Sequence, residues 1–190
     1  MANSGTLHHA FISELRDAYD AERQLTRALA KLAKSAANPD LRDAFEAHRR
    51  QTEGHIERLE QVFAGLDETV RGKRCDGIAG IIEEGKSVME EKFDATTMDA
   101  CLIAAGQRAE HYEMAAYGTL VAWAQTMGHT DAALDPISWT RSERWIRCPA
   151  CLEAVAGARA GGSLRSSRKV PSGWSCTKAR RSARWRASSI

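Results

Sequence analysis

The chain has 190 residues, of which 43% are apolar and 6% aromatic, and its net charge is +2. This size fits one domain with a modest core. The sequence has no run of about 18 uncharged apolar residues, and its first residues lack the basic-then-apolar order of a secretion signal. Five widely spread cysteines do not indicate a disulfide framework. We therefore expect a cytoplasmic protein with no membrane segment.

The small net charge hides two oppositely charged parts. Residues 1–135 carry 15 Lys and Arg against 23 Asp and Glu, a balance of −8. Residues 136–190 carry 12 against 2, a balance of +10. All six histidines lie in the first part, and four of the five tryptophans lie in the second. These differences predict a folded domain over residues 1–135 and a separate basic tail over residues 136–190.

The first predicted element is a long helix over residues 6–36, because apolar residues recur there with helical spacing. Its inward positions, three or four residues apart, are Phe11, Leu15, Ala18, Glu22, Leu25, Leu29 and Leu32. Glu22 therefore lies in the middle of an apolar face. An unpaired carboxylate buried there would cost several kcal/mol. Glu22 is then either protonated, exposed through a gap, or close to a cation.

A second helix is predicted over residues 39–63, where Asn38 supplies a cap and Pro39 suits the first helical position. Its inward positions are Leu41, Phe45, His48, Thr52, His55, Leu59 and Val62. Three consecutive inward positions are therefore polar. If the two helices form an antiparallel hairpin turning near residue 37, Glu22 and Thr52 lie 15 residues to either side of the turn and share a height.

A long connection and a third long helix follow. Residues 66–95 contain a short amphipathic helix, predicted over residues 76–90, and a connection of this length lets a bundle cross over. The third long helix is predicted over residues 96–128. Its inward face carries Glu110 and Glu113 near mid-length.

In each of the three long predicted helices, polar side chains thus interrupt the apolar face near mid-length. The interrupting residues are Glu22, His48, Thr52, His55, Glu110, Glu113 and Tyr117. Converging carboxylates repel one another unless a positive charge lies among them. A divalent metal ion, or a pair, would supply that charge, and Glu and His ligands on facing helices suit iron or manganese.

The candidate site residues have different expected roles. We expect Glu22, Glu110 and Glu113 to form the metal constellation, whereas His48 and His55 are either ligands or hydrogen-bonded core residues. Two hydroxyl side chains are expected to support the site. Thr52 either bonds back to its own helix or orients a ligand. Tyr117 is expected to pack with its hydroxyl on a carboxylate.

Three runs of the sequence resemble the YciE/YciF-type ferritin-like proteins, a bacterial family known as domain of unknown function 892. They are residues 19–32, 52–59 and 109–120, and the last run contains Glu-His-Tyr-Glu followed by Tyr-Gly-Thr-Leu. The resemblance covers about residues 6–133. It implies an all-α, ferritin-like antiparallel bundle with a long crossover, usually a homodimer, that is linked to stress responses.

The same resemblance implies a function and a set of ligands. Members of the family are thought to hold a dinuclear centre, which here would contain iron or manganese and serve a metal-dependent oxidase or peroxide-handling activity. Glu22, Glu110 and Glu113 match the family's carboxylate positions. Gln51 stands directly before Thr52, where the family usually has a Glu, and an amide is a poorer metal ligand.

The resemblance ends after about residue 133, where the family continues into a fourth, Leu-rich helix ending in a Glu-Glu pair. Pro136 interrupts any helix there, and no helical apolar spacing returns. We expect a degraded or missing fourth helix and an irregular tail, and an altered reading frame near codons 134–136 would produce both. With Gln51, this loss favours an alternative function, a non-catalytic helical stress or structural dimer that no longer binds metal.

The basic tail has two candidate functions of its own. Arg184 and Arg186 flank Trp185, a combination that suits nucleic acid, although non-specific contact with polyanions is the simpler interpretation. Cys148 and Cys151 form half of a zinc motif, but the tail offers too few further ligands to complete it.

Overall fold

A computed structural model describes residues 5–129, and these residues form four α-helices and no strand. The helices are α1 Leu7–Ser35, α2 Pro39–Gly65, α3 Asp76–Met89 and α4 Ala95–Thr126. The prediction of an all-α fold is confirmed, and the predicted helix ends differ from the observed ones by at most two residues. The predictions of a degraded fourth bundle helix and an irregular basic tail concern residues outside the described range.

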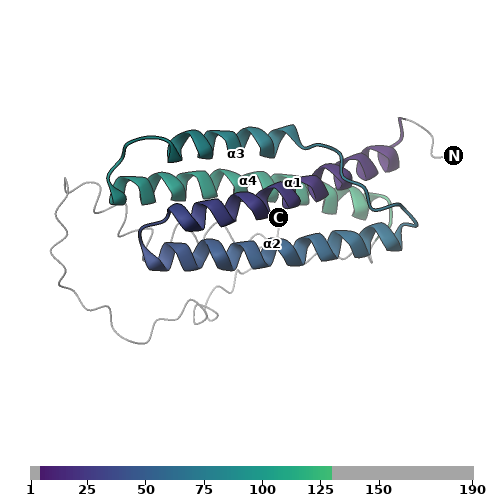
Figure 1. Ribbon diagram of the computed structural model, residues 1–190. Helices are drawn as coiled ribbons and strands as arrows, with labels where there is room; N and C mark the ends of the chain where they lie inside the picture. Colours follow the sequence, from purple (N-terminus) through teal and green to yellow (C-terminus); the bar gives the residue numbers. More distant parts are fainter. Residues whose placement is uncertain (1–4, 130–190) are drawn as a thin grey trace, which may run out of the picture.

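The helix α1 lies at the centre of the arrangement. It packs closely against α2, α3 and α4, and α3 also packs along α4 (Figure 1). The helices α1 and α2 form the predicted antiparallel hairpin. His48 of α2 contacts Glu110 and Glu113 of α4 through its side chain. No helix in the described part of the chain is long and apolar enough to cross a membrane.

Local capping explains where the long helices begin. The side chain of Thr6 accepts a hydrogen bond from the backbone N–H of His9, and Asp94 likewise accepts one from Thr97. Asn38 caps α2 by accepting from the N–H groups of Asp40 and Leu41. Such side-chain acceptors satisfy N–H groups that have no partner inside the helix.

A buried carboxylate from α4 holds the turn between α1 and α2. Asp99 is 4% exposed and accepts hydrogen bonds from the backbone N–H groups of Ala37 at 2.8 Å and Asn38 at 2.9 Å. Asp99 was not predicted from the sequence, although it lies four residues before the buried Ile103, on the same face of α4. This contact fixes the hairpin turn against α4 and therefore helps to set the heights at which the three helices meet.

The core consists of two apolar clusters, one toward each end of the bundle. One cluster includes Leu25, Leu29, Phe45 and Leu102. The other includes Phe11, Leu15, Leu59, Phe63 and Leu120. All the inward positions predicted for α1 and α2 are buried. The polar residues of the interrupted faces lie between the two clusters.

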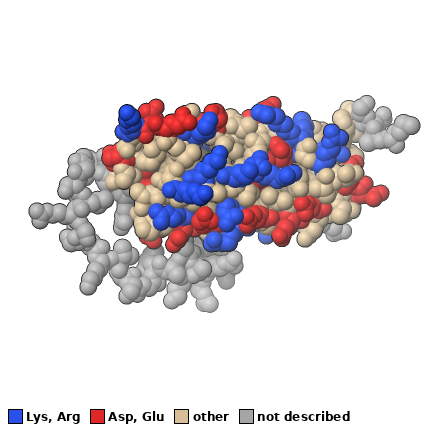
Figure 2. All heavy atoms as spheres, in the orientation of Figure 1, with Lys and Arg blue, Asp and Glu red and all other residues tan. Residues whose placement is uncertain are grey.

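The outer face of α1 carries a row of cations. Arg23, Arg27, Lys31 and Lys34 are all exposed, and Figure 2 shows Lys and Arg side chains gathered along this helix. Acidic side chains lie on both sides of the row in the same view. The contrast between this charged face and the buried one confirms the amphipathic pattern that predicted α1.

Candidate metal centre

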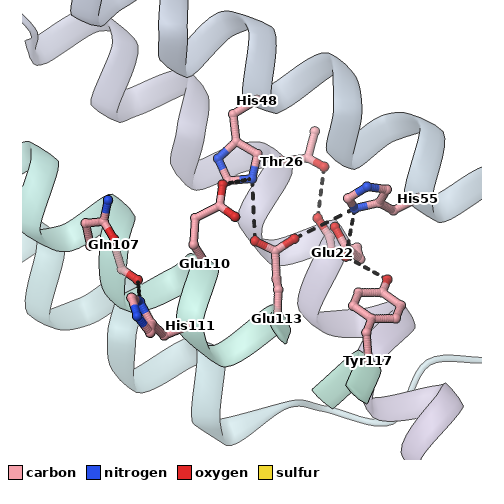
Figure 3. Close-up of polar contacts among 9 residues, drawn as sticks. All are labelled: Glu22, Thr26, His48, His55, Gln107, Glu110, His111, Glu113 and Tyr117. Carbon is pink, nitrogen blue, oxygen red and sulfur yellow. Dashed lines mark hydrogen bonds and ion pairs between the residues drawn. The ribbon is translucent and has the colours of Figure 1, made fainter. Parts of the chain in front are cut away.

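A layer of buried ionisable side chains, shown in Figure 3, lies between the two apolar clusters. The layer consists of Glu22 of α1, His48 and His55 of α2, and Glu110 and Glu113 of α4. None of these residues is more than 6% exposed. Their helical spacing explains the convergence, because each occupies an inward position near the middle of its helix.

The first group in this layer consists of Glu22, His55 and Glu113. His55 Nδ1 lies 3.2 Å from Glu22 Oε1 and 3.7 Å from Glu113 Oε1. The hydroxyl of Tyr117 donates a hydrogen bond of 2.7 Å to Glu22 Oε1, which is the carboxylate contact predicted for this tyrosine. Tyr117 thereby orients Glu22 toward α2 and α4.

The second group consists of His48, Glu110 and Glu113. His48 Nε2 lies 3.1 Å from Glu110 Oε1 and 3.4 Å from Glu113 Oε2. In each group, one atom from each of the three residues lies within 4.8 Å of the other two. Glu113 belongs to both groups and directs one carboxylate oxygen toward each (Figure 3). A carboxylate in this position could contribute one oxygen to each group of donor atoms.

Burial and neighbouring charges shift the two facing carboxyl groups in opposite directions. Burial, together with the nearby charge of Glu113, raises the pKa of Glu22 to about 7, although His55 and Tyr117 oppose this shift. Burial also acts to raise the pKa of Glu113, but hydrogen bonds from His48 and His55 outweigh it and lower that pKa to about 2. Without a cation beside them, Glu113 is therefore ionised more readily than Glu22, and a state with both carboxylates ionised is disfavoured.

The donor atoms fit a pair of divalent cations. Glu22 Oε2 is buried and has no hydrogen-bond partner within residues 5–129, so a carboxylate oxygen is available to a ligand. The two groups offer imidazole nitrogens and carboxylate oxygens but no thiolate, and such donors suit iron and manganese. Two cations would also relieve the repulsion among the three carboxylates.

The structure places Gln51 and Thr52, which are neighbours in the sequence, in different surroundings. Gln51 is exposed, so the structure does not bring it into the buried layer. Thr52 is 0% exposed and lies on the inward face of α2, but its hydroxyl does not bond back to its own helix.

A second polar cluster lies beyond the two groups and was missed by the sequence analysis. The hydroxyl of Tyr112 donates to Asp17 Oδ2 at 3.1 Å and lies 2.8 Å from Cys75 Sγ. Burial raises the pKa of the Cys75 thiol, so this thiol stays protonated and joins α1, α3 and α4 structurally. Helical spacing gave no signal for this cluster because Tyr112 lies off the inward face of α4.

Comparison with known proteins gives concordant matches. The model of a family described as a domain of unknown function, DUF892, matches residues 6–136. Protein YciF of Escherichia coli (strain K12) is 45% identical over 132 residues, which span 69% of this chain and 80% of that protein.

Two solved structures are also similar to this chain. The E. coli stress protein YciF matches with a TM-score of 0.69 and 39% identity, covering 82% of this chain and 96% of that one. YcfI from Rhodopseudomonas palustris, described as a putative structural protein, matches with a TM-score of 0.71 and 35% identity, covering 82% and 97%. The ferritin-like bundle expected from the sequence agrees with the observed helices and with these matches. The chain therefore belongs to the DUF892 family, that of the YciE/YciF-type proteins.

Proposed function

We propose that this protein is a YciF-type stress-response protein that binds two divalent metal ions, iron or manganese, between α1, α2 and α4. The observation that carries the proposal is the sharing of Glu113 between two buried groups, each of which adds one more carboxylate and one imidazole. Dinuclear carboxylate proteins of the ferritin-like kind hold their ions with Glu and His side chains that project inward from facing helices.

The two groups assign the ligands. Glu22 and His55 would hold one ion, and His48 and Glu110 the other, while Glu113 would give one oxygen to each. Tyr117 keeps Glu22 in place through its hydrogen bond. The apolar clusters on both sides exclude water from the layer, which strengthens the attraction between the carboxylates and a cation.

Iron bound in such a site supplies one-electron chemistry toward oxygen or peroxide. This chain contributes a proton-holding group beside it, because Glu22 is the carboxyl whose pKa is raised to about 7. Glu22 would release a proton when the cation binds. We therefore propose an oxidase or peroxide-handling activity as the ancestral function of the site.

Calorimetric titration of the metal-free protein with Mn(II), and with Fe(II) under anaerobic conditions, tests metal binding. We expect two ions per chain and a rise in melting temperature, because a ligand that binds only the folded state stabilises it. His111→Ala is the matched control, since His111 lies beside the ligands in sequence but is exposed. Absence of both heat and a melting shift at millimolar metal would overturn the proposal.

Peroxide consumption tests the redox part separately. Reduction of one hydrogen peroxide to two waters takes two electrons and two protons, so two Fe(II) ions should become Fe(III) for each peroxide lost. We expect this ratio in the Fe(II)-loaded protein and in His111→Ala. If the protein binds Fe(II) but consumes peroxide no faster than free Fe(II) does, the redox part of the proposal fails. The protein would then bind metal without being an enzyme of this kind.

A second candidate is a non-catalytic helical protein with a structural role. It is favoured by the description of the R. palustris relative as a putative structural protein and by the exposure of Gln51, which leaves three carboxylates in the described layer. This candidate predicts that Glu22→Leu stabilises the protein in the presence of Mn(II), because the change removes an uncompensated buried charge. The metal-binding proposal predicts a loss of stability under the same conditions.

A further inference from the structure

The hydroxyl of Thr52 stands out among the polar groups of the buried layer. Thr52 is 0% exposed, and its Oγ1 has no hydrogen-bond partner within residues 5–129. His48 precedes it by four residues and His55 follows it by three, so all three side chains share one face of α2. Thr52 therefore lies between the histidine of one metal-binding group and the histidine of the other.

Three other threonines in helices of residues 5–129 behave differently. Their hydroxyls bond back to the carbonyl oxygen four residues earlier, at 2.9 Å for Thr26, 2.9 Å for Thr119 and 2.8 Å for Thr126. This is the usual way in which a threonine inside a helix satisfies its hydroxyl. Thr52 makes no such bond to His48, although it is the most deeply buried of the four.

A buried hydroxyl without a partner costs free energy, and a valine would fill the same volume without that cost. The hydroxyl therefore needs a reason other than packing. A hydroxyl can donate one hydrogen bond. The layer around it is rich in carboxylate oxygens, which accept hydrogen bonds but cannot donate them when ionised. A small anion entering the layer would therefore need a donor such as this hydroxyl.

We propose that Thr52 is a positioning residue whose hydroxyl donates a hydrogen bond to a small anionic oxygen ligand, of the hydroxide or peroxide class, held between the two metal-binding groups. The inference rests on the metal pair of the proposed function. Thr52 itself is not a metal ligand in this account. It selects and orients what binds beside the ions.

Azide serves as the probe for this ligand, and Co(II) as a coloured substitute for the native ions. The full-length protein is loaded with Co(II) and titrated with azide in four forms: wild type, Thr52→Val, Thr52→Ser and Thr26→Val. We expect unchanged Co(II) stoichiometry in all four. The azide dissociation constant should rise about tenfold in Thr52→Val, because this variant loses the hydroxyl at position 52 that donates to the ligand. It should stay within about twofold of wild type in Thr52→Ser and Thr26→Val, which keep a hydroxyl at position 52.

The melting temperature of the metal-free forms gives a second readout. Thr26→Val should melt lower than wild type because it loses a hydrogen bond that is made. Thr52→Val should melt at the same temperature or higher, because it removes a hydroxyl that has no partner. If the melting temperature of Thr52→Val falls as far below that of wild type as the melting temperature of Thr26→Val does, the proposal is overturned.

The outcomes separate this inference from the function on which it rests. If wild type binds no Co(II), the metal proposal fails and this inference fails with it. If wild type binds Co(II) but azide affinity is the same in wild type and Thr52→Val, only the inference fails, and the hydroxyl then serves an ordered water. A drop in Co(II) stoichiometry in Thr52→Val would also overturn it, by making Thr52 part of the metal site.

Discussion

At the scale of single residues, Glu113 differs from the other carboxylates because it faces both histidines. We predict that Glu113→Gln abolishes binding of both ions, since an amide is a poor ligand and cannot bridge as a carboxylate does. Glu22→Gln and Glu110→Gln should each leave one ion bound. Metal analysis after gel filtration measures these stoichiometries, and equal losses in all three variants would argue against the shared role of Glu113.

Glu22 should make the metal-free protein less stable as the pH rises. Its pKa is raised from 4.5 to about 7 in the folded state, so the folded protein holds a proton that the unfolded chain releases earlier. The stabilisation from that proton is complete below about pH 4.5 and is lost as the pH rises through 7, by about 2–3 kcal/mol. Urea unfolding between pH 5 and pH 8 should show this fall.

The matched variant for this experiment is Glu22→Gln, which cannot ionise. Its stability should change much less over the same pH range. Glu113 does not interfere, because its pKa is lowered to about 2 and its contribution is lost only in acid, as the pH falls from 4.5 toward 2. Identical pH profiles for wild type and Glu22→Gln would show that Glu22 does not hold the proton.

Helical spacing predicted most of the candidate site, because a polar residue on an apolar face can be seen from sequence alone. Glu22, His48 and His55 were found in this way. Gln51 was considered because the resemblance gives the family a Glu at this position, yet successive residues on a helix point about 100° apart, and Gln51 is exposed. The pairing of particular atoms, and the sharing of Glu113, depend on helix heights that spacing alone does not fix.

At the scale of the elements, Asp99 should be essential to the α1–α2 hairpin. Its carboxylate accepts from two backbone N–H groups at the turn. Asp99→Ala should lower the free energy of unfolding by about 2–4 kcal/mol, because it leaves both donors without their acceptor. Asp99→Asn keeps one acceptor oxygen and should lose less. Equal stability of Asp99→Ala and wild type in urea unfolding would contradict this role.

The helices themselves were predictable because their signals are local. Each signal lies in a short stretch of sequence. The signals are capping side chains such as Asn38, the apolar face of each helix, and the long connection from α2 to α4. The contacts that join elements are not local. The backbone N–H of Lys73 donates to the carbonyl of Arg16, and this hydrogen bond attaches the α2–α3 connection to α1. No sequence pattern predicts this contact.

At the scale of the whole molecule, α2 and α4 should depend on metal for their association. Close helix packing joins α1 to each of them, whereas the polar layer links them directly. Bound ions would add coordination bonds across that layer. We predict that Mn(II) slows amide hydrogen exchange in the middle of α2 and α4 more than in α3. Equal slowing in all the helices would indicate only general stabilisation.

We also predict a homodimer, which the relation to YciF-type proteins favours. Light scattering should give twice the chain mass of 20.9 kDa. A monodisperse monomer would contradict this prediction without affecting the metal site, since all five proposed ligands come from one chain.

The most direct test of the central claim is anomalous diffraction at the manganese edge from crystals of the full-length protein grown with Mn(II). The account predicts two anomalous peaks, one on each side of the Glu113 carboxylate, with one histidine beside each peak. A map with no peak in the buried layer, or with peaks only at surface carboxylates, would contradict it.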